Sequence, residues 1–217
     1  MLKDTLSGIC AGILIAIGGS IFLAVSPDNK YLAAVLFSVA LLCICYKGYA
    51  LFTGKVGYIL QQHDKPAVSA LLLSLLGNTI GCVAFGKMLR AAMPALGATA
   101  DTLCQGKLDS QSFLQTLVRG LMCGILMYLA VSIFREKNTP LGILFCIPVF
   151  ILSGFEHSIA DIFYFAASGI VSLRACGFLW TVILGNAIGG VLLPALQWAN
   201  RPTVPEKAKE KEAAHAK

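Results

Sequence analysis

The sequence LGNTIG at residues 76–81 recurs as LGNAIG at residues 184–189, an offset of 108 residues. A second related pair lies ahead of these copies, because GICAGIL at residues 8–14 resembles GLMCGIL at residues 120–126, an offset of 112 residues. Ordered matches at similar offsets predict that the chain consists of two related halves. The glycines in these motifs suit helix packing, since small residues let two helix backbones approach closely.

The chain that carries these motifs is too apolar for a water-soluble protein. Of its 217 residues, 57% are hydrophobic and 13% are charged, whereas a soluble domain carries about 25% charged residues. Residues 5–27, 66–86 and 175–200 contain no Asp, Glu, Lys, Arg or His, and each run reaches the roughly 20 residues that a membrane-spanning helix needs. The first run is long for a signal peptide and lacks an A-x-A cleavage site, so we interpret it as a span.

We predict six helices, at residues 5–26, 31–62, 66–92, 113–134, 140–170 and 175–199. The second and fifth are too long and too polar for simple spans. The second contains Lys47, Gly48 and LFTGK at residues 51–55, and the fifth contains Pro148 and SGFEH at residues 153–157. We expect both helices to break inside the membrane and restart, which is tolerated only within protein or beside a water-filled cavity.

The two predicted breaks also correspond, because Phe52 and Phe155 are related by an offset of 103 residues. Each half then holds three spans, and an odd number makes the halves insert with opposite orientations. Inverted repeats with broken helices are typical of transporters and channels whose site lies near the midplane. The predicted fold is therefore an all-α membrane protein of six transmembrane helices, forming a channel domain at residues 1–199. A charged, disordered cytoplasmic tail is expected at residues 200–217.

The distribution of basic residues predicts the orientation of the chain. Cytoplasmic loops carry the excess of Lys and Arg, so we compared the two sides outside the second span. With the N-terminus inside, nine basic residues are cytoplasmic and six are external. We therefore expect a multi-pass protein of the plasma or inner membrane with both termini in the cytoplasm. The charged tail is more simply a solvated segment than a nucleic-acid binder.

The sequence SGFEHSIA at residues 153–160 resembles the signature of the formate/nitrite transporter family. LFT at residues 51–53 resembles the Ω-loop of that family, and the two Gly-Asn motifs fall where the family has them. The resemblance covers about residues 3–200. It implies a homopentamer of aquaporin-like protomers, each with its own pore for formate, nitrite, hydrosulfide or a related small anion.

The resemblance also implies roles for particular residues. His157 would lie at the centre of the pore, and Thr53 would face it. Apolar constrictions would lie on either side of this pair. The constriction residues implied by the resemblance are Leu51, Phe150, Phe37 and Leu41.

The sequence departs from the family pattern at three places. Ala50 stands where many members have an acidic residue, and Asp161 stands where many have Asn. Leu141 lies near the position of a lysine that is frequent in the family. These departures leave open the preferred anion and any coupling to protons.

Two devices would help an anion through an apolar constriction, where loss of hydration costs several kcal/mol. Helices that restart after Thr53 and after His157 would direct positive dipole ends at the pore centre, with Lys55 at a pore mouth. Alternatively, a weak-acid anion could take up a proton and cross as the neutral acid. Histidine suits this transfer, because its unperturbed pKa is about 6.5. We hypothesise that His157 is neutral in the empty pore and donates a proton as cargo arrives.

Structural alternatives accompany these functional roles. His157 could be a buried histidine satisfied by backbone carbonyls, and Thr53 could satisfy the broken backbone. We expect Glu156 to accept hydrogen bonds from loop amides or to lie at a protomer contact. Asp161 follows His157 by four residues and could contact it or face a neighbouring helix.

The asparagines of the repeated motif also have two alternatives. Asn78 and Asn186 could bind substrate or water in the two vestibules. Equally, each could form hydrogen bonds across helices and fix their packing.

Other functional classes fit the sequence less well. An aquaporin-like channel for small neutral solutes is the main alternative, but the chain has no Asn-Pro-Ala box. A membrane enzyme is not expected, because His63 and His215 fall in a loop and the tail, leaving one histidine in the membrane. The eight cysteines show no spacing typical of disulfides or metal ligands. We therefore predict no cofactor, no metal and no nucleic-acid partner; the expected partners are small anions, the lipid bilayer and further copies of the chain.

Overall fold

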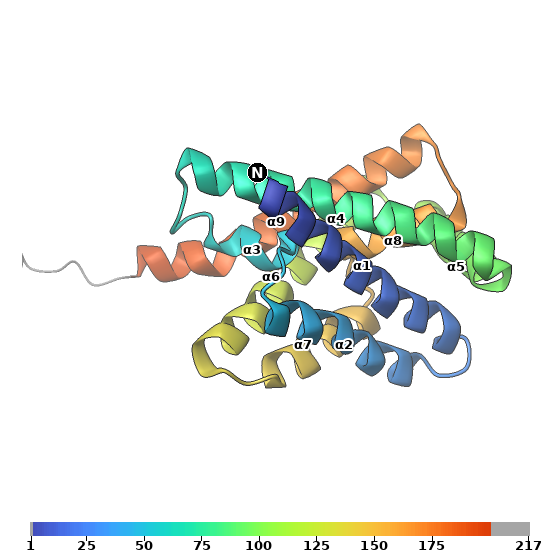
Figure 1. Cartoon of the computed structure of the whole chain (residues 1–217), viewed down its shortest axis with the longest axis horizontal. Helices are drawn as coiled ribbons and strands as arrows, with labels where there is room; N and C mark the ends of the chain where they lie inside the picture. The colour runs from blue at the N-terminus through green and yellow to red at the C-terminus, as the bar shows by residue number, and fades with distance from the viewer. Residues whose placement is uncertain (1, 201–217) are drawn as a thin grey trace, which may run out of the picture.

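The computed structural model describes residues 2–200, which form helices joined by short connections and contain no β-strand (Figure 1). The all-α prediction is thus confirmed for this part of the chain, whereas residues 201–217 of the predicted tail lie outside the described residues. The elements in chain order are α1 (Leu2–Val25), α2 (Lys30–Lys47), α3 (Phe52–Lys55), the 3-10 turn η1 (Val56–Tyr58), α4 (Lys65–Ala92), α5 (Pro94–Ser110), α6 (Phe113–Lys137), α7 (Leu141–Leu152), α8 (Ser158–Ser168) and α9 (Leu173–Ala199).

Five helices within residues 2–200 are long and apolar enough to cross a membrane, namely α1, α2, α4, α6 and α9. The helices α7 and α8 are apolar but shorter. The predicted helix over residues 31–62 does not run that far, because α2 ends at Lys47 and the turn η1 ends at Tyr58. The count of six spans stays a prediction, as does the interpretation of each short pair as one interrupted span.

Glycines in the left-handed conformation lie where the chain leaves two helices. Gly48, with φ of 68°, follows α2, and its N–H donates to the carbonyl of Cys45. Gly154, with φ of 72°, follows α7. This conformation is strained for any residue with a Cβ atom, so glycine ends both helices and turns the chain toward the short segments that precede α3 and α8.

The helix α5 was not predicted from the sequence. Its residues include Asp101, Gln105 and Lys107, and this polarity hid it in what we interpreted as a connection between spans. A helical signal was nevertheless present, because the buried residues Gly97, Ala100, Cys104 and Leu108 recur at intervals of three and four. They pack α5 against α8.

The repeated glycines bring helices together within each half. The helix α1 packs against α4 in the first half, and α6 packs against α9 in the second (Figure 1). A Cβ atom on Gly81 would lie 2.5 Å from the carbonyl oxygen of Ile9, and one on Gly185 would lie 2.6 Å from that of Leu117. Their packing role is therefore confirmed, and the two halves use it in the same way.

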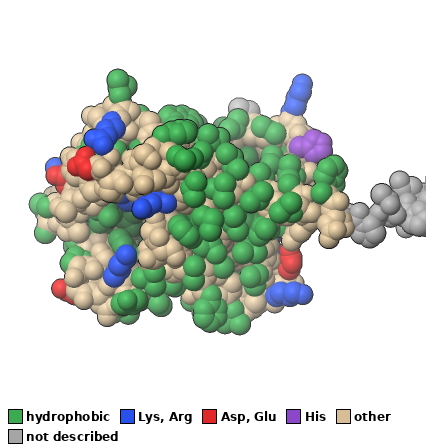
Figure 2. All heavy atoms as spheres, turned by 180° about the vertical axis from the view of Figure 1, so that it is seen from behind, with side chains coloured by type: hydrophobic (Ala, Val, Ile, Leu, Met, Phe, Trp, Pro, Cys, Tyr) green, Lys and Arg blue, Asp and Glu red, His purple; other side chains and the backbone are tan. Residues whose placement is uncertain are grey.

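Apolar side chains cover a broad outer surface between the two ends of the molecule (Figure 2). Large exposed residues include Leu72, Leu76, Trp180 and Leu184, which belong to α4 and α9. In water such a surface would be costly, because apolar patches on soluble proteins rarely exceed a few hundred Å². In a bilayer it is the expected contact with lipid.

Gly189→Ala should separate α6 from α9, because the added methyl group would overlap the backbone carbonyl of Leu121. Overpacking of this kind costs about 1–3 kcal/mol or more, so we expect a lower thermal unfolding temperature in detergent. Gly177→Ala is the matched control on the same helix, since nothing lies within 4 Å of the added atom. Equal unfolding temperatures for the two variants would contradict the packing role.

Candidate functional site

Asn78 of α4 joins three segments of the first half through its side chain. Its Oδ1 accepts a hydrogen bond from the backbone N–H of Phe52 at 2.9 Å, and this N–H belongs to the first residue of α3. Its Nδ2 donates to the carbonyls of Gly8 and Ala50, both at 2.9 Å. The amide is fully buried, and both of its N–H hydrogens are used by backbone.

Asn186 of α9 repeats this arrangement in the second half. Its Oδ1 accepts from the N–H of Ser158, the first residue of α8, at 2.8 Å. Its Nδ2 donates to the carbonyls of Gly120 and Glu156, both at 2.8 Å. Of the two roles expected for the asparagines, the observed one is the fixing of backbone across helices. Neither amide retains an N–H for a substrate.

These contacts bring Thr53 and His157 together from opposite halves of the sequence. Thr53 Oγ1 lies 2.9 Å from His157 Nε2, and both side chains are buried. The other ring nitrogen, Nδ1, accepts the N–H of Ala160 at 3.1 Å and caps α8. A neutral ring that accepts at Nδ1 carries its hydrogen on Nε2, so it donates to the Thr53 hydroxyl.

Of the two short helices next to this pair, one begins where it was predicted and the other does not. We expected one to restart after His157, and α8 does begin at Ser158. The other was expected after Thr53, but α3 begins two residues earlier than that, at Phe52. The reason is the Asn78 side chain, which caps the N–H of Phe52 and so places Thr53 inside the first turn.

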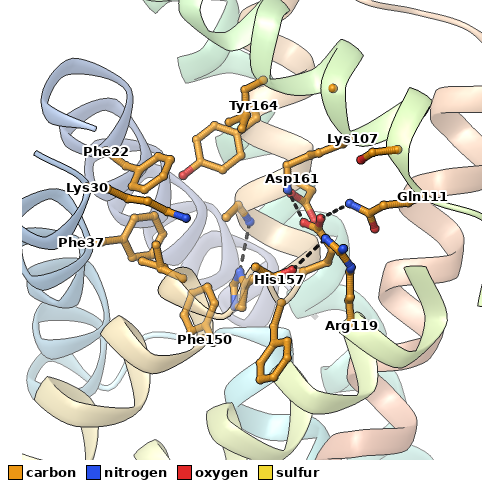
Figure 3. A pocket seen from close by; sticks show the side chains of 18 of the residues that line it. Phe22, Lys30, Phe37, Lys107, Gln111, Arg119, Phe150, His157, Asp161 and Tyr164 are labelled. Atoms are coloured by element: carbon orange, nitrogen blue, oxygen red, sulfur yellow. Dashed lines mark hydrogen bonds and ion pairs between the residues drawn. The ribbon is translucent and has the colours of Figure 1, made fainter. Parts of the chain in front are cut away.

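A cavity of about 520 Å³ reaches His157 from the side of the molecule that carries the start of α2 (Figure 3). We call it the His157 cavity. Phe37 and Phe150 line it, their rings packed edge to face at 6.2 Å, and the Phe150 ring stacks on the imidazole at 5.7 Å. Two of the four residues expected at the constrictions therefore line the same cavity as the histidine.

A second cavity, of about 310 Å³, lies near the other end of α2, and we call it the Lys55 cavity. Leu41 and Leu51 line it, together with Lys55, Arg135 and Phe134. Phe37 and Leu41 are one turn apart on α2, so the two apolar layers are separated by about 6 Å along the helix. The four apolar residues thus divide between the two cavities, with the Thr53–His157 contact nearby.

Glu156 and Asp161 meet Lys107, a residue that sequence reasoning did not select (Figure 3). The Lys107 ammonium contacts Glu156 Oε2 and lies 3.0 Å from Asp161 Oδ1. Gln111 Nε2 donates to Glu156 Oε1 at 2.6 Å. The observed partners of the Glu156 carboxylate are thus two side chains, Lys107 of α5 and Gln111, which directly follows α5, and not backbone amides; its alternative place at a protomer contact stays a prediction.

The Asp161 side chain faces α5, where it meets Lys107. Asp161 is also hydrogen-bonded to His157, but through the backbone: the Asp161 N–H donates to the His157 carbonyl at 2.9 Å. Lys107 could have been found only after α5 was recognised, because it lies in a polar segment with no motif.

Arg119 of α6 donates to the Gly154 carbonyl at 3.3 Å and also lines the His157 cavity. Within residues 2–200, no group of three or more His, Cys, Asp or Glu side chains is arranged to hold a metal ion, and the cysteines there are free.

Comparison with known proteins identifies the family. The sequence model described as formate/nitrite transporter matches residues 1–199. The uncharacterized transporter YwcJ of Bacillus subtilis is 29% identical, over 81% of this chain and 77% of its own length. The nitrite transporter NirC of Salmonella typhimurium is 27% identical, over 82% of this chain and 75% of its own length.

A solved structure described as a pentameric formate channel with formate bound has a similar fold. It superposes with a TM-score of 0.77 at 26% identity, covering 91% of this chain and 95% of that channel. The chain therefore belongs to the formate/nitrite transporter family, and it is a multi-pass membrane protein. The resemblance expected from residues 153–160 and 51–53 is confirmed.

Asn186→Ala should destabilise the protein, because it leaves the Ser158 N–H and the Gly120 and Glu156 carbonyls without their buried partner. Each unsatisfied buried group costs about 1–3 kcal/mol, so the thermal unfolding temperature should fall clearly. Asn200→Ala serves as the control, since Asn200 is exposed at the end of α9. An unchanged unfolding temperature for Asn186→Ala would contradict the structural role.

Proposed function

We propose that this protein is a channel for small monovalent anions of weak acids, such as formate, nitrite or hydrosulfide. The observation that carries the proposal is the buried Thr53–His157 contact at 2.9 Å, with a cavity toward each end of α2 and apolar residues lining both. The family, and the formate and nitrite named for the similar proteins, support the same cargo class.

The geometry supports a path that runs along α2. Cargo enters the His157 cavity, passes the Phe37 and Phe150 rings, meets the Thr53–His157 pair and leaves past Leu41 and Leu51. Size is the first filter, because the lining at the narrow part is bulky and buried. Charge is the second, since an anion that loses its water shell pays several kcal/mol unless the protein replaces those hydrogen bonds.

The Thr53–His157 pair, which we call the waist, offers hydrogen bonds in a fixed direction. His157 Nε2–H donates to the Thr53 oxygen, which leaves the hydroxyl hydrogen of Thr53 for the cargo. Since Nδ1 already accepts the Ala160 N–H, Nε2 is the ring nitrogen that faces the cargo; for it to donate a proton, the ring would first have to take up a second proton at Nδ1 from water, so that the transfer leaves a neutral imidazole. Transfer of a proton from His157 to a weak-acid anion remains part of this proposal.

The assembly and placement of the protein complete the proposal. We infer a homopentamer, since the similar formate channel is pentameric, and we place one pore in each protomer. The protomer lies in the plasma or inner membrane with both termini in the cytoplasm, in lipid contact through its apolar surface. The relatives are transporters and channels, which supports transport without catalysis.

Thr53→Val should lower formate uptake into proteoliposomes by about tenfold, because a hydrogen bond to a charged group contributes roughly 1.5–3 kcal/mol. Thr53→Ser is the matched control, since it keeps the hydroxyl and should retain most of the uptake. Uptake is measured with isotope-labelled formate at fixed pH. If Val and Ser variants transport equally, Thr53 only satisfies the backbone.

His157→Asn should remove the dependence of formate and nitrite uptake on pH, because asparagine is close in size but does not titrate. The measurement is the initial uptake rate across the range in which an unperturbed histidine ionises. Swelling of the same proteoliposomes in glycerol tests the neutral-solute alternative. Unchanged pH dependence in the variant would sink the proton role of His157, and rapid glycerol entry would favour an aquaporin-like channel.

A further inference from the structure

Lys107, Glu156 and Asp161 form a buried cluster of one base and two acids. One ammonium from α5 faces two carboxylates, Glu156 from the connection before α8 and Asp161 from α8 itself. The side chains of Glu156 and Asp161 are only 3% and 2% exposed, and that of Lys107 is 14% exposed. If both acids were ionised, this buried cluster would carry one uncompensated negative charge.

The ion pairs of Glu156 and Asp161 are both with Lys107. Two further basic residues, Lys30 of α2 and Arg119 of α6, line the His157 cavity with them (Figure 3), but within residues 2–200 no ion pair joins either to these acids.

Two arginines near α8 form hydrogen bonds with backbone carbonyls. The Arg119 guanidinium of α6 binds the Gly154 carbonyl, and Arg90 of α4 binds carbonyls at the far end of α8. His157, on the same chain segment, accepts the Ala160 N–H at Nδ1. These arginines keep their positive charge, because a carbonyl is a neutral acceptor, but within residues 2–200 the cation in direct contact with both carboxylates is Lys107.

The two carboxylates differ in how their second oxygens are satisfied. Glu156 Oε1 accepts a hydrogen bond from Gln111. Asp161 Oδ2 is buried and has no hydrogen-bond partner. A bare carboxylate oxygen in such a place is costly, and two acids that share one site do not both ionise readily. A proton on Asp161 would remove one of the two negative charges that share Lys107.

Asp161 also lines the His157 cavity, through which the proposed cargo passes (Figure 3). It lies four residues after His157, so the two positions fall one helical turn apart. A proton on this side chain would therefore be next to the path and ahead of the histidine.

We propose that the Asp161 carboxyl group holds a proton and that it releases this proton to the weak-acid anion inside the His157 cavity, which the residue lines. The Asp161 O–H bond breaks, a new O–H bond forms on an oxygen of the anion, and the neutral acid moves to the waist. The Asp161 carboxylate then stays paired with Lys107 until water in the cavity returns a proton to it. This inference rests on the proposed function but names a different proton donor: loss of the pH dependence in Asp161→Asn but not in His157→Asn would favour Asp161 over His157.

Infrared spectroscopy of the purified protein tests the protonation without any transport assay. The wild type at neutral pH should show the carbonyl band of a protonated carboxyl group, and this band should shift when aspartate is labelled with carbon-13 in its carboxyl group. Asp161→Asn should lack the band, whereas Asp109→Asn should keep it, since Asp109 is an exposed partner of Arg174. Absence of the band in the wild type, or a shift only with labelled glutamate, would overturn the assignment.

Transport measurements test the transfer step in the same variants. In Asp161→Asn, the increase in formate uptake on acidification should be about tenfold or more smaller than in the wild type, because a positioned proton donor contributes roughly 10²–10⁴-fold to the rate. Asp109→Asn should keep it, and size-exclusion chromatography checks that both variants assemble. An unchanged pH profile in Asp161→Asn would refute the transfer. If the wild type carries no formate or nitrite at all, the proposed function fails, while the infrared result still decides the protonation.

Discussion

Two buried carboxamides fix the centre of this protein. Asn78 and Asn186 each bind the first N–H of a helix that starts inside the molecule and the carbonyls of two other segments. Buried backbone groups need such partners, especially where a helix begins away from water. The glycines around both asparagines make this possible, because they let α4 approach α1 and α9 approach α6 until the amides reach the opposing backbone. Without these contacts, neither α3 nor α8 would have a fixed starting point.

Fixing those two starting points sets the chemistry of the site. Thr53 lies in the first turn of α3 and His157 caps α8, so capping both helices places the hydroxyl against the imidazole. The same connection before α8 carries Glu156, and α8 carries Asp161, so both acids reach the lysine on α5. One constraint therefore positions a neutral hydrogen-bonding pair and, beside it, an ionic cluster. A weak acid can use both, because it exists as an anion and as a neutral molecule.

Much of this architecture could be predicted from the sequence, because the helices and the two halves correspond to long apolar runs and to repeated motifs. The motif at 76–81 and 184–189 predicted the two halves, and the polar residues within long apolar runs predicted where α2 and α7 end. The choice between substrate binding and backbone fixing for Asn78 depended on distances that no spacing contains. The helix α5 was missed because its polar residues resemble a loop, and Lys107 was missed with it. Its partners come from about 50 residues further along the chain, a pairing that only the fold creates.

The central claim is that the waist at Thr53 and His157 passes weak acids because it is narrow, apolar and able to offer hydrogen bonds. The most direct measurement compares the uptake of formate, nitrite, hydrosulfide and chloride by one batch of wild-type proteoliposomes across pH. Chloride is the decisive member of the set, since its conjugate acid is too strong to form in water. The account predicts that uptake of the weak acids rises as the pH falls while chloride stays outside. Chloride entry that matches formate at every pH would contradict it.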